Sequence, residues 1–151
     1  MARPDDSNVV ILRSDPQPNE GAAMLQVITP LNLTKYNELS DISSLEGLNF
    51  ELDDIVDNSN CNEDALIPFK IKGVAKSITW SMDTQNHKII TSKNQEVEIV
   101  GIYTKKDKRK YFMVKGFNLH AHVLMPKANF AGHIKDIELQ EGATLYLPVK
   151  L

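Results

Sequence analysis

The second half of the chain alternates between apolar and polar residues with a period of two, and this pattern constrains the fold most strongly. Successive side chains on a β-strand point to opposite faces, so the pattern predicts strands with one buried face. Turn-forming residues interrupt the pattern at short intervals, which favours a mostly antiparallel sheet. The predicted strands span residues 67–80, 87–91, 96–104, 111–125, 131–139 and 143–149. Pro126 is expected to end its strand, because proline cannot donate a hydrogen bond to a neighbouring strand.

The first half of the chain shows weaker signals. Residues 24–28 form an apolar run that predicts a strand, and residues 53–64 are rich in Asp and Asn, which predicts a long loop. Thr34 is a candidate cap for a short helix that runs to about Leu45, with Gly47 as its stop signal. The predicted fold class is therefore α+β, a mainly antiparallel or mixed β-sheet with one short helix.

Charge divides the chain into two unlike parts. Residues 1–66 hold 13 Asp or Glu and 3 Lys or Arg, a balance of −10, whereas residues 67–151 hold 7 and 14, a balance of +7. We expect residues 1–65 to form an acidic N-terminal segment with short strands and one helix. We expect that segment to pack on a β-rich, metal-binding core at residues 66–151, because its leucines and valines need a surface against which to be buried.

Several classes of protein are excluded or disfavoured by composition. The single cysteine, Cys61, rules out an intrachain disulfide framework and a Cys₂ or Cys₄ zinc site. No apolar run approaches the ~20 residues of a membrane helix, and no secretory signal is visible, so a cytoplasmic protein without a membrane partner is expected. Residues 105–110 hold five basic residues, which could contact phosphates but are more typical of a solvated hairpin tip. With a pI of about 5.8, nucleic acid is not an expected partner.

Three of the four histidines indicate a metal site. His120 and His122 lie two residues apart in a predicted strand, which puts both on one face with Cα atoms ~6.5–7 Å apart. The chain then turns, and His133 returns on what is predicted to be the neighbouring strand. Three neutral imidazoles with an open fourth position are typical of catalytic zinc. The alternative is a set of surface histidines, which is also our interpretation of His87 in its polar turn.

The residues around these histidines resemble a known family. Residues 116–122 (GFNLHAH) followed by residues 132–136 (GHIKD) resemble the metal-binding motif of the α-acetolactate decarboxylases, in which ten residues separate His-x-His from the third histidine. Residues 99–104 (IVGIYT) and 69–73 (FKIKG) are similar to strands that precede the motif in those enzymes. The resemblance covers about residues 66–140, and it is also shared with the plant and prokaryote conserved domains, whose second gap is usually longer.

The resemblance implies a fold, a cofactor and a reaction. The resemblance implies that His120, His122 and His133 hold Zn²⁺. The zinc would bind the hydroxyl and carbonyl oxygens of a 2-hydroxy-3-oxo acid and stabilise the enediolate that forms when CO₂ leaves. An arginine that binds substrate in the family is replaced here by Lys70, which keeps the charge but loses the bidentate fork. Residues 47–52 (GLNFEL) are similar to the setting of a family glutamate, which makes Glu51 the second catalytic candidate. Another family glutamate lies well beyond the third histidine and has no counterpart in this shorter chain.

Two classes of function stay open. The first is a zinc-dependent, acetolactate decarboxylase-like carboxy-lyase that acts on a small anionic substrate such as acetolactate, or a redirected enzyme of this fold that uses the same zinc on another carbonyl substrate. The second is a non-catalytic metal-binding or assembly module, nearer to the plant and prokaryote conserved domains. Either is expected to form a homo-oligomer, with a dimer as the first expectation.

Overall fold

The computed structural model describes residues 32–59, 65–81, 89–105, 117–128 and 130–149, together with the backbone of two short paired strands, β1 (Arg3–Pro4) and β2 (Val10–Ile11). The main elements are β3 (Leu33–Glu38), α1 (Leu45–Asp57), β4 (Ile67–Ser81), β5 (Ile89–Tyr103), β6 (Leu119–Met125), the 3₁₀ turn η2 (Pro126–Ala128), β7 (Phe130–Leu139) and β8 (Thr144–Pro148). No helix in these described ranges is long and apolar enough to cross a bilayer.

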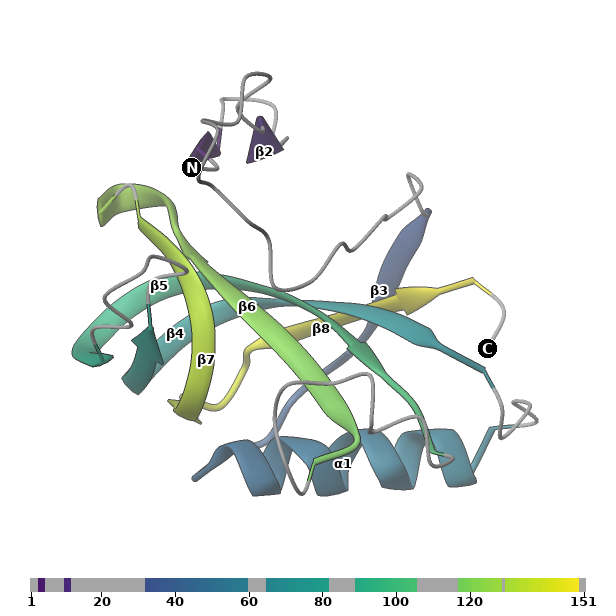
Figure 1. Ribbon diagram of the computed structural model, residues 1–151. Coiled ribbons are helices and arrows are strands. Elements are labelled where there is room, and N and C mark those ends of the chain that lie inside the picture. The colour runs from purple at the N-terminus through teal and green to yellow at the C-terminus, as the bar shows by residue number, and fades with distance from the viewer. Residues whose placement is uncertain are drawn as a thin grey trace.

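One curved antiparallel sheet holds most of the described chain (Figure 1). Its strand order is β3-β8-β4-β5-β6-β7, and every neighbouring pair is antiparallel. The later part of β7 also pairs with β4, so that strands β4 to β7 close on one another. The mainly antiparallel sheet with one short helix confirms the predicted fold class.

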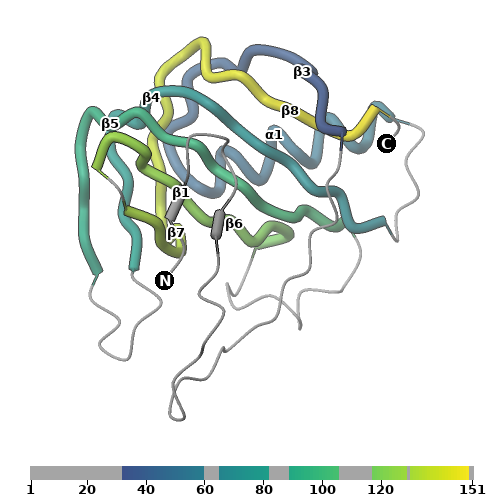
Figure 2. Tube along the Cα trace, turned by 90° about the horizontal axis from the view of Figure 1, so that it is seen from above, coloured from purple at the N-terminus to yellow at the C-terminus, as the bar shows by residue number. Residues whose placement is uncertain are grey.

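Helix α1 covers one face of the sheet (Figures 1 and 2). Its apolar side chains recur at the three- and four-residue spacing of a helix face and are buried, at Leu45, Leu48, Leu52, Ile55 and Val56. They join one core cluster with the inward-facing residues of the sheet strands, among them Phe69, Ile71, Ile99, Leu119 and Val123. Burial of each large aliphatic side chain contributes about 1.5–3 kcal/mol, so this face holds the helix to the sheet.

The helix predicted from Thr34 to about Leu45 is wrong. Residues Leu33–Glu38 form the edge strand β3, which pairs with β8 through a bulge near Tyr36. The helix instead begins after Ser44, whose hydroxyl accepts a hydrogen bond from the Gly47 amide at 3.0 Å. Gly47 therefore lies in the first turn rather than ending a helix.

The predicted loop at residues 53–64 is wrong in its first part, because Asp53 to Asp57 complete α1. The apolar residues Ile55 and Val56 within it are buried against the core, and this burial outweighs the turn preference of the neighbouring aspartates. The strand predicted at residues 24–28 lies outside the described residues.

The strands of the second half follow the prediction closely. The predicted strands 67–80, 131–139 and 143–149 correspond to β4, β7 and β8, and those predicted at 87–91 and 96–104 merge into the long strand β5. Strand β6 ends at Met125, directly before Pro126, as expected. Residues 111–116 of the remaining prediction lie outside the described part of the chain.

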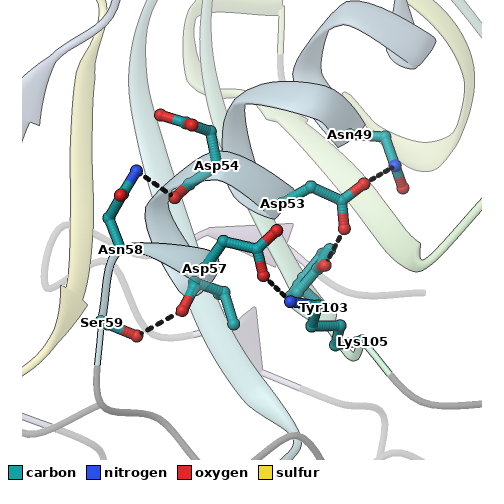
Figure 3. Close-up of polar contacts among 9 residues, drawn as sticks. Asn49, Asp53, Asp54, Asp57, Asn58, Ser59, Tyr103 and Lys105 are labelled. Atoms are coloured by element: carbon teal, nitrogen blue, oxygen red, sulfur yellow. Dashed lines mark hydrogen bonds and ion pairs between the residues drawn. The ribbon is translucent and has the colours of Figure 1, made fainter.

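A polar network ties the helix to the end of β5 (Figure 3). The buried hydroxyl of Tyr103 donates to Asp53, and the Asn49 side-chain amide donates to the same carboxylate at 2.8 Å. The carbonyl oxygen of the Asn49 side chain accepts from the backbone amide of Asn118, directly before β6. Burial, and then the adjacent carboxylate of Asp53, raise the pKa of Tyr103 well above its ordinary value. The phenol therefore stays protonated and keeps its hydrogen bond at every physiological pH.

Candidate metal centre

Strand β6 presents two histidines on the face of the sheet that α1 does not cover. Leu119, Ala121 and Val123 of β6 belong to the core cluster that includes the helix. His120 and His122 alternate with them and therefore point to the opposite face. The strand predicted from the period-2 pattern thus places both imidazoles on one side.

Strand β7 brings the third histidine beside them. His133 is the cross-strand partner of His122, since the chain reverses through η2 and returns antiparallel to β6. Gly132 lets β7 pack closely against β4 on its other side, because a Cβ at this position would lie 2.5 Å from the Trp80 ring and 2.5 Å from the Ser81 carbonyl oxygen. The glycine of the Gly-His pair is therefore required by packing against β4.

The three imidazoles converge. The Nε2 atoms of His120 and His122 are 3.0 Å apart, and one ring nitrogen from each of the three residues lies within 4.8 Å of the others. The rings of His120 and His122 stack, and the ring of His133 stands edge-on to both, with centroids 4.7 and 5.2 Å away. Nitrogens held at ~2.0–2.1 Å from a tetrahedral zinc ion are separated by about 3.3 Å, so small movements would bring all three to one ion.

Burial and charge keep His133 in the form that binds a metal. Its Nε2 atom is buried and makes no hydrogen bond within the described part of the chain. Burial lowers the pKa of His133 to about 4, with smaller contributions from the charges of Lys135 and His122. The imidazole is therefore neutral at pH 7, with a ring nitrogen available as a ligand. Three imidazole donors with a buried, unsatisfied nitrogen fit a metal ion, and the donor set suits zinc among several divalent metals.

Lys70 lies in the same row of residues as two of the histidines. The row runs across four strands, from Lys70 of β4 through Val100 of β5 and His122 of β6 to His133 of β7. Cross-strand partners share a face, so Lys70 projects on the histidine side. At ~4.8 Å per strand, its Cα is about 10 Å from that of His122.

Lys70 is engaged by a carboxylate that the sequence analysis did not single out. Glu98 of β5 binds Lys70 Nζ at 3.0 Å through one oxygen and Lys72 Nζ at 2.9 Å through the other. Burial alone would raise the pKa of Glu98, but the hydrogen bonds from Lys72 and Lys70 outweigh it and hold the pKa below its ordinary value. The sequence did contain a signal for this contact. Glu98 occupies an even-numbered position of β5, and Lys70 and Lys72 occupy even-numbered positions of β4, so the two lysines share one face of their strand. Only the register between the strands shows that these residues meet.

Glu51 is not placed beside the histidines. It lies on α1, which packs on the opposite face of the sheet (Figure 1). The catalytic role that the resemblance implied for Glu51 stays a prediction, and the sheet between it and the imidazoles does not support it.

The sequence analysis also missed the role of Asp136, the last residue of the GHIKD segment. One oxygen of its carboxylate accepts the backbone amides of Leu45 and Ile137, each at 2.9 Å. Asp136 therefore joins the strand of His133 to the first turn of α1.

Three solved structures are similar to this chain in fold. A Staphylococcus aureus protein of unknown function, described as similar to α-acetolactate decarboxylase, matches with a TM-score of 0.62 and 18% identity over 80% of this chain and 53% of that chain. Acetolactate decarboxylase from Bacillus subtilis subspecies spizizenii matches with a TM-score of 0.58 and 16% identity over 79% and 54% of the two chains. The α-acetolactate decarboxylase from Bacillus subtilis strain 168 matches with a TM-score of 0.55 and 16% identity over 76% of this chain and 51% of that chain.

No protein-family model and no curated protein sequence matches the chain. The chain spans about half the length of these three solved structures. At these identities the likeness shows the fold, and it confirms the fold expected from the GFNLHAH and GHIKD segments. The chain adopts an acetolactate decarboxylase-like fold, with three histidines gathered on the sheet face opposite α1.

Proposed function

We propose that this chain is a zinc-dependent, acetolactate decarboxylase-like lyase that acts on a small 2-hydroxy-3-oxo acid such as acetolactate. The observation that carries the proposal is the convergence of His120, His122 and His133 within 4.8 Å on one face of the sheet. The similarity of the fold to decarboxylases of Bacillus subtilis supports the choice of reaction.

The side chains of the site have separable roles in this proposal. The three imidazoles hold the metal and leave room in its coordination sphere for substrate. Zinc, when bound, supplies Lewis-acid stabilisation of the negative charge that develops as CO₂ leaves. Lys70, on the same face, attracts the substrate carboxylate and orients it.

The direct test is acetoin release from acetolactate by the purified chain, with zinc content measured on the same sample. We expect turnover that a chelator abolishes and zinc restores. His122→Ala should lower zinc affinity by more than the ~10–100-fold typical of losing a residue that only supports a metal ligand. His87→Ala, in the remaining histidine, is the matched control and should retain zinc. A chain that binds zinc and releases no acetoin from acetolactate or related acids would contradict the enzyme and leave the metal centre.

The second candidate is a metal-binding assembly module without catalysis. It is favoured by the engagement of Lys70 with Glu98 and by the position of Glu51 on the far side of the sheet. This candidate predicts a homo-oligomer, a dimer first, whose assembly depends on metal. Light scattering of the wild type and of a His120→Ala, His122→Ala double variant tests it, and an oligomer unchanged in mass by metal removal would contradict it.

A further inference from the structure

Two lysines and one glutamate form a compact charged triad on the histidine face. Glu98 bridges Lys70 and Lys72, and all three side chains are partly buried, with 15% of the Glu98 side chain exposed and 22% and 38% of the two lysines. Two positive charges and one negative charge leave the triad with a net charge of +1. The triad is therefore a site that offers one uncompensated positive charge, not two.

The triad borders both the histidines and open space. Glu98 is the cross-strand partner of Leu124, two residues beyond His122 on the same face of β6, so it is a diagonal neighbour of that histidine. Such diagonal pairs have Cα atoms ~7–8 Å apart, within reach of a small ligand that spans them. A hollow of about 400 Å³ is lined by β4, β5 and Pro126, and Lys72 and Glu98 are among its walls. None of the described residues that line this hollow is a histidine, so the triad is linked to the imidazoles by the diagonal position of Glu98 relative to His122 and by the row that Lys70 shares with His122.

We propose that Glu98 is a specificity-determining residue, an internal counterion that denies a second carboxylate of the ligand any gain in affinity at this site. This inference rests on the proposed function and adds to it that small monocarboxylate 2-hydroxy or 2-oxo acids bind as well as their dicarboxylate counterparts. The first carboxylate is attracted by the net charge of +1. Once the first carboxylate has bound, the triad carries no net charge. A second carboxylate of the ligand, or the second charge of a phosphate dianion, then lies close to the negative charge of Glu98 and adds no binding free energy.

The test compares two probes that differ by one carboxylate, lactate and malate, by calorimetry on the full chain loaded with zinc. The wild type is expected to bind the two with affinities within about twofold of each other. In Glu98→Gln, which keeps the shape and removes the charge, each ligand carboxylate is released from the same repulsion. We therefore expect lactate to bind about threefold more tightly and malate about tenfold, close to the square of that factor because malate carries two charges.

Two control variants separate this role from a general effect of charge or packing. Glu38→Gln removes the same charge from the edge strand β3, where Glu38 pairs with Lys35 in an exposed ion pair and is not among the residues that line the hollow. It should leave the ratio of the two affinities unchanged. Glu98→Asp keeps the charge and should retain the wild-type ratio even if the lysine contacts lengthen.

The outcomes decide the proposal in each case. Wild-type binding of malate more than about fivefold tighter than that of lactate would overturn it without any variant. So would an equal gain, or no gain, for both ligands in a folded Glu98→Gln protein, with folding followed by circular dichroism. Because binding is measured without turnover, a chain that releases no acetoin can still show the change in ratio, and failure of the decarboxylase proposal is distinguishable from failure of this one.

Discussion

Gly132 sets how closely the strand that carries His133 approaches β4. Because a Cβ at this position would lie 2.5 Å from both the Trp80 ring and the Ser81 carbonyl oxygen, neither neighbour can yield easily. We expect Gly132→Ala to destabilise the protein by about 1–3 kcal/mol, the usual cost of overpacking, and to weaken zinc binding because His133 moves with the strand. Urea unfolding and zinc titration measure the two effects.

A second glycine supplies the control for that substitution. A Cβ at Gly47, in the first turn of α1, would lie at an ordinary 3.6 Å from the Ser44 hydroxyl oxygen. Alanine at a helical position is favoured over glycine by about 0.5–1 kcal/mol, so Gly47→Ala should be neutral or stabilising. If Gly132→Ala were equally harmless, the packing explanation of the Gly-His pair would be wrong.

At the scale of elements, α1 is held at its first turn by two side chains from different parts of the chain. The hydroxyl of Ser44 caps the amide of Gly47, and the carboxylate of Asp136 on β7 accepts the amide of Leu45. Acidic and hydroxyl groups at a helix start satisfy amides that have no partner within the helix.

Removal of the cap tests this description of α1. We expect Ser44→Ala to lower the free energy of unfolding by about 1 kcal/mol, within the range of ~0.5–2 kcal/mol known for such caps. Ser43→Ala removes the same hydroxyl from the exposed neighbouring residue and should change stability by less than about 0.5 kcal/mol. Chemical denaturation compares the pair, and equal losses in both variants would show that Ser44 does not act as the cap.

The errors in the predicted elements have one physical origin. The stretch from Thr34 to Leu45 carries apolar residues every three positions, which is only a moderate helix pattern. Its first part forms strand β3 instead, because it pairs with β8. The aspartates of residues 53–57 favour turns by themselves, but burial of Ile55 and Val56 decided for a helix. Local preference was weak in both segments, and tertiary packing overrode it. The period-2 pattern of the second half was strong, and the strands there could be predicted.

At the scale of the whole molecule, the charged triad makes stability depend on pH. The pKa of Glu98 is lowered in the folded protein, so the carboxylate stabilises the fold fully above its ordinary pKa of 4.5, and this contribution is lost as the pH falls through the lower folded value. We expect the advantage of wild type over Glu98→Gln in the free energy of unfolding to shrink as the pH falls from about 5 to about 3. Urea unfolding over this range measures it, and an advantage that grew toward low pH would contradict the assignment.

Metal binding should also act on the whole molecule, because the three histidines join β6 to β7, and β7 also pairs with β4. A ligand that binds only the folded state adds stability of about 4 kcal/mol at a concentration 1,000 times its dissociation constant. We expect zinc to raise the melting temperature of the wild type and to leave that of His120→Ala nearly unchanged. A rise of equal size in both would place the bound zinc elsewhere.

The sequence by itself determined the antiparallel sheet and the candidate metal site, because both depend on local geometry. Residues two apart in a strand share a face, so His120 and His122 had to point the same way, and the short turn after Met125 returned His133 beside them. Only the tertiary structure decided which groups face those imidazoles. Whether Glu98 meets Lys70 and Lys72, and on which side of the sheet Glu51 lies, depends on the register and packing of elements that are distant in sequence, which no local pattern encodes.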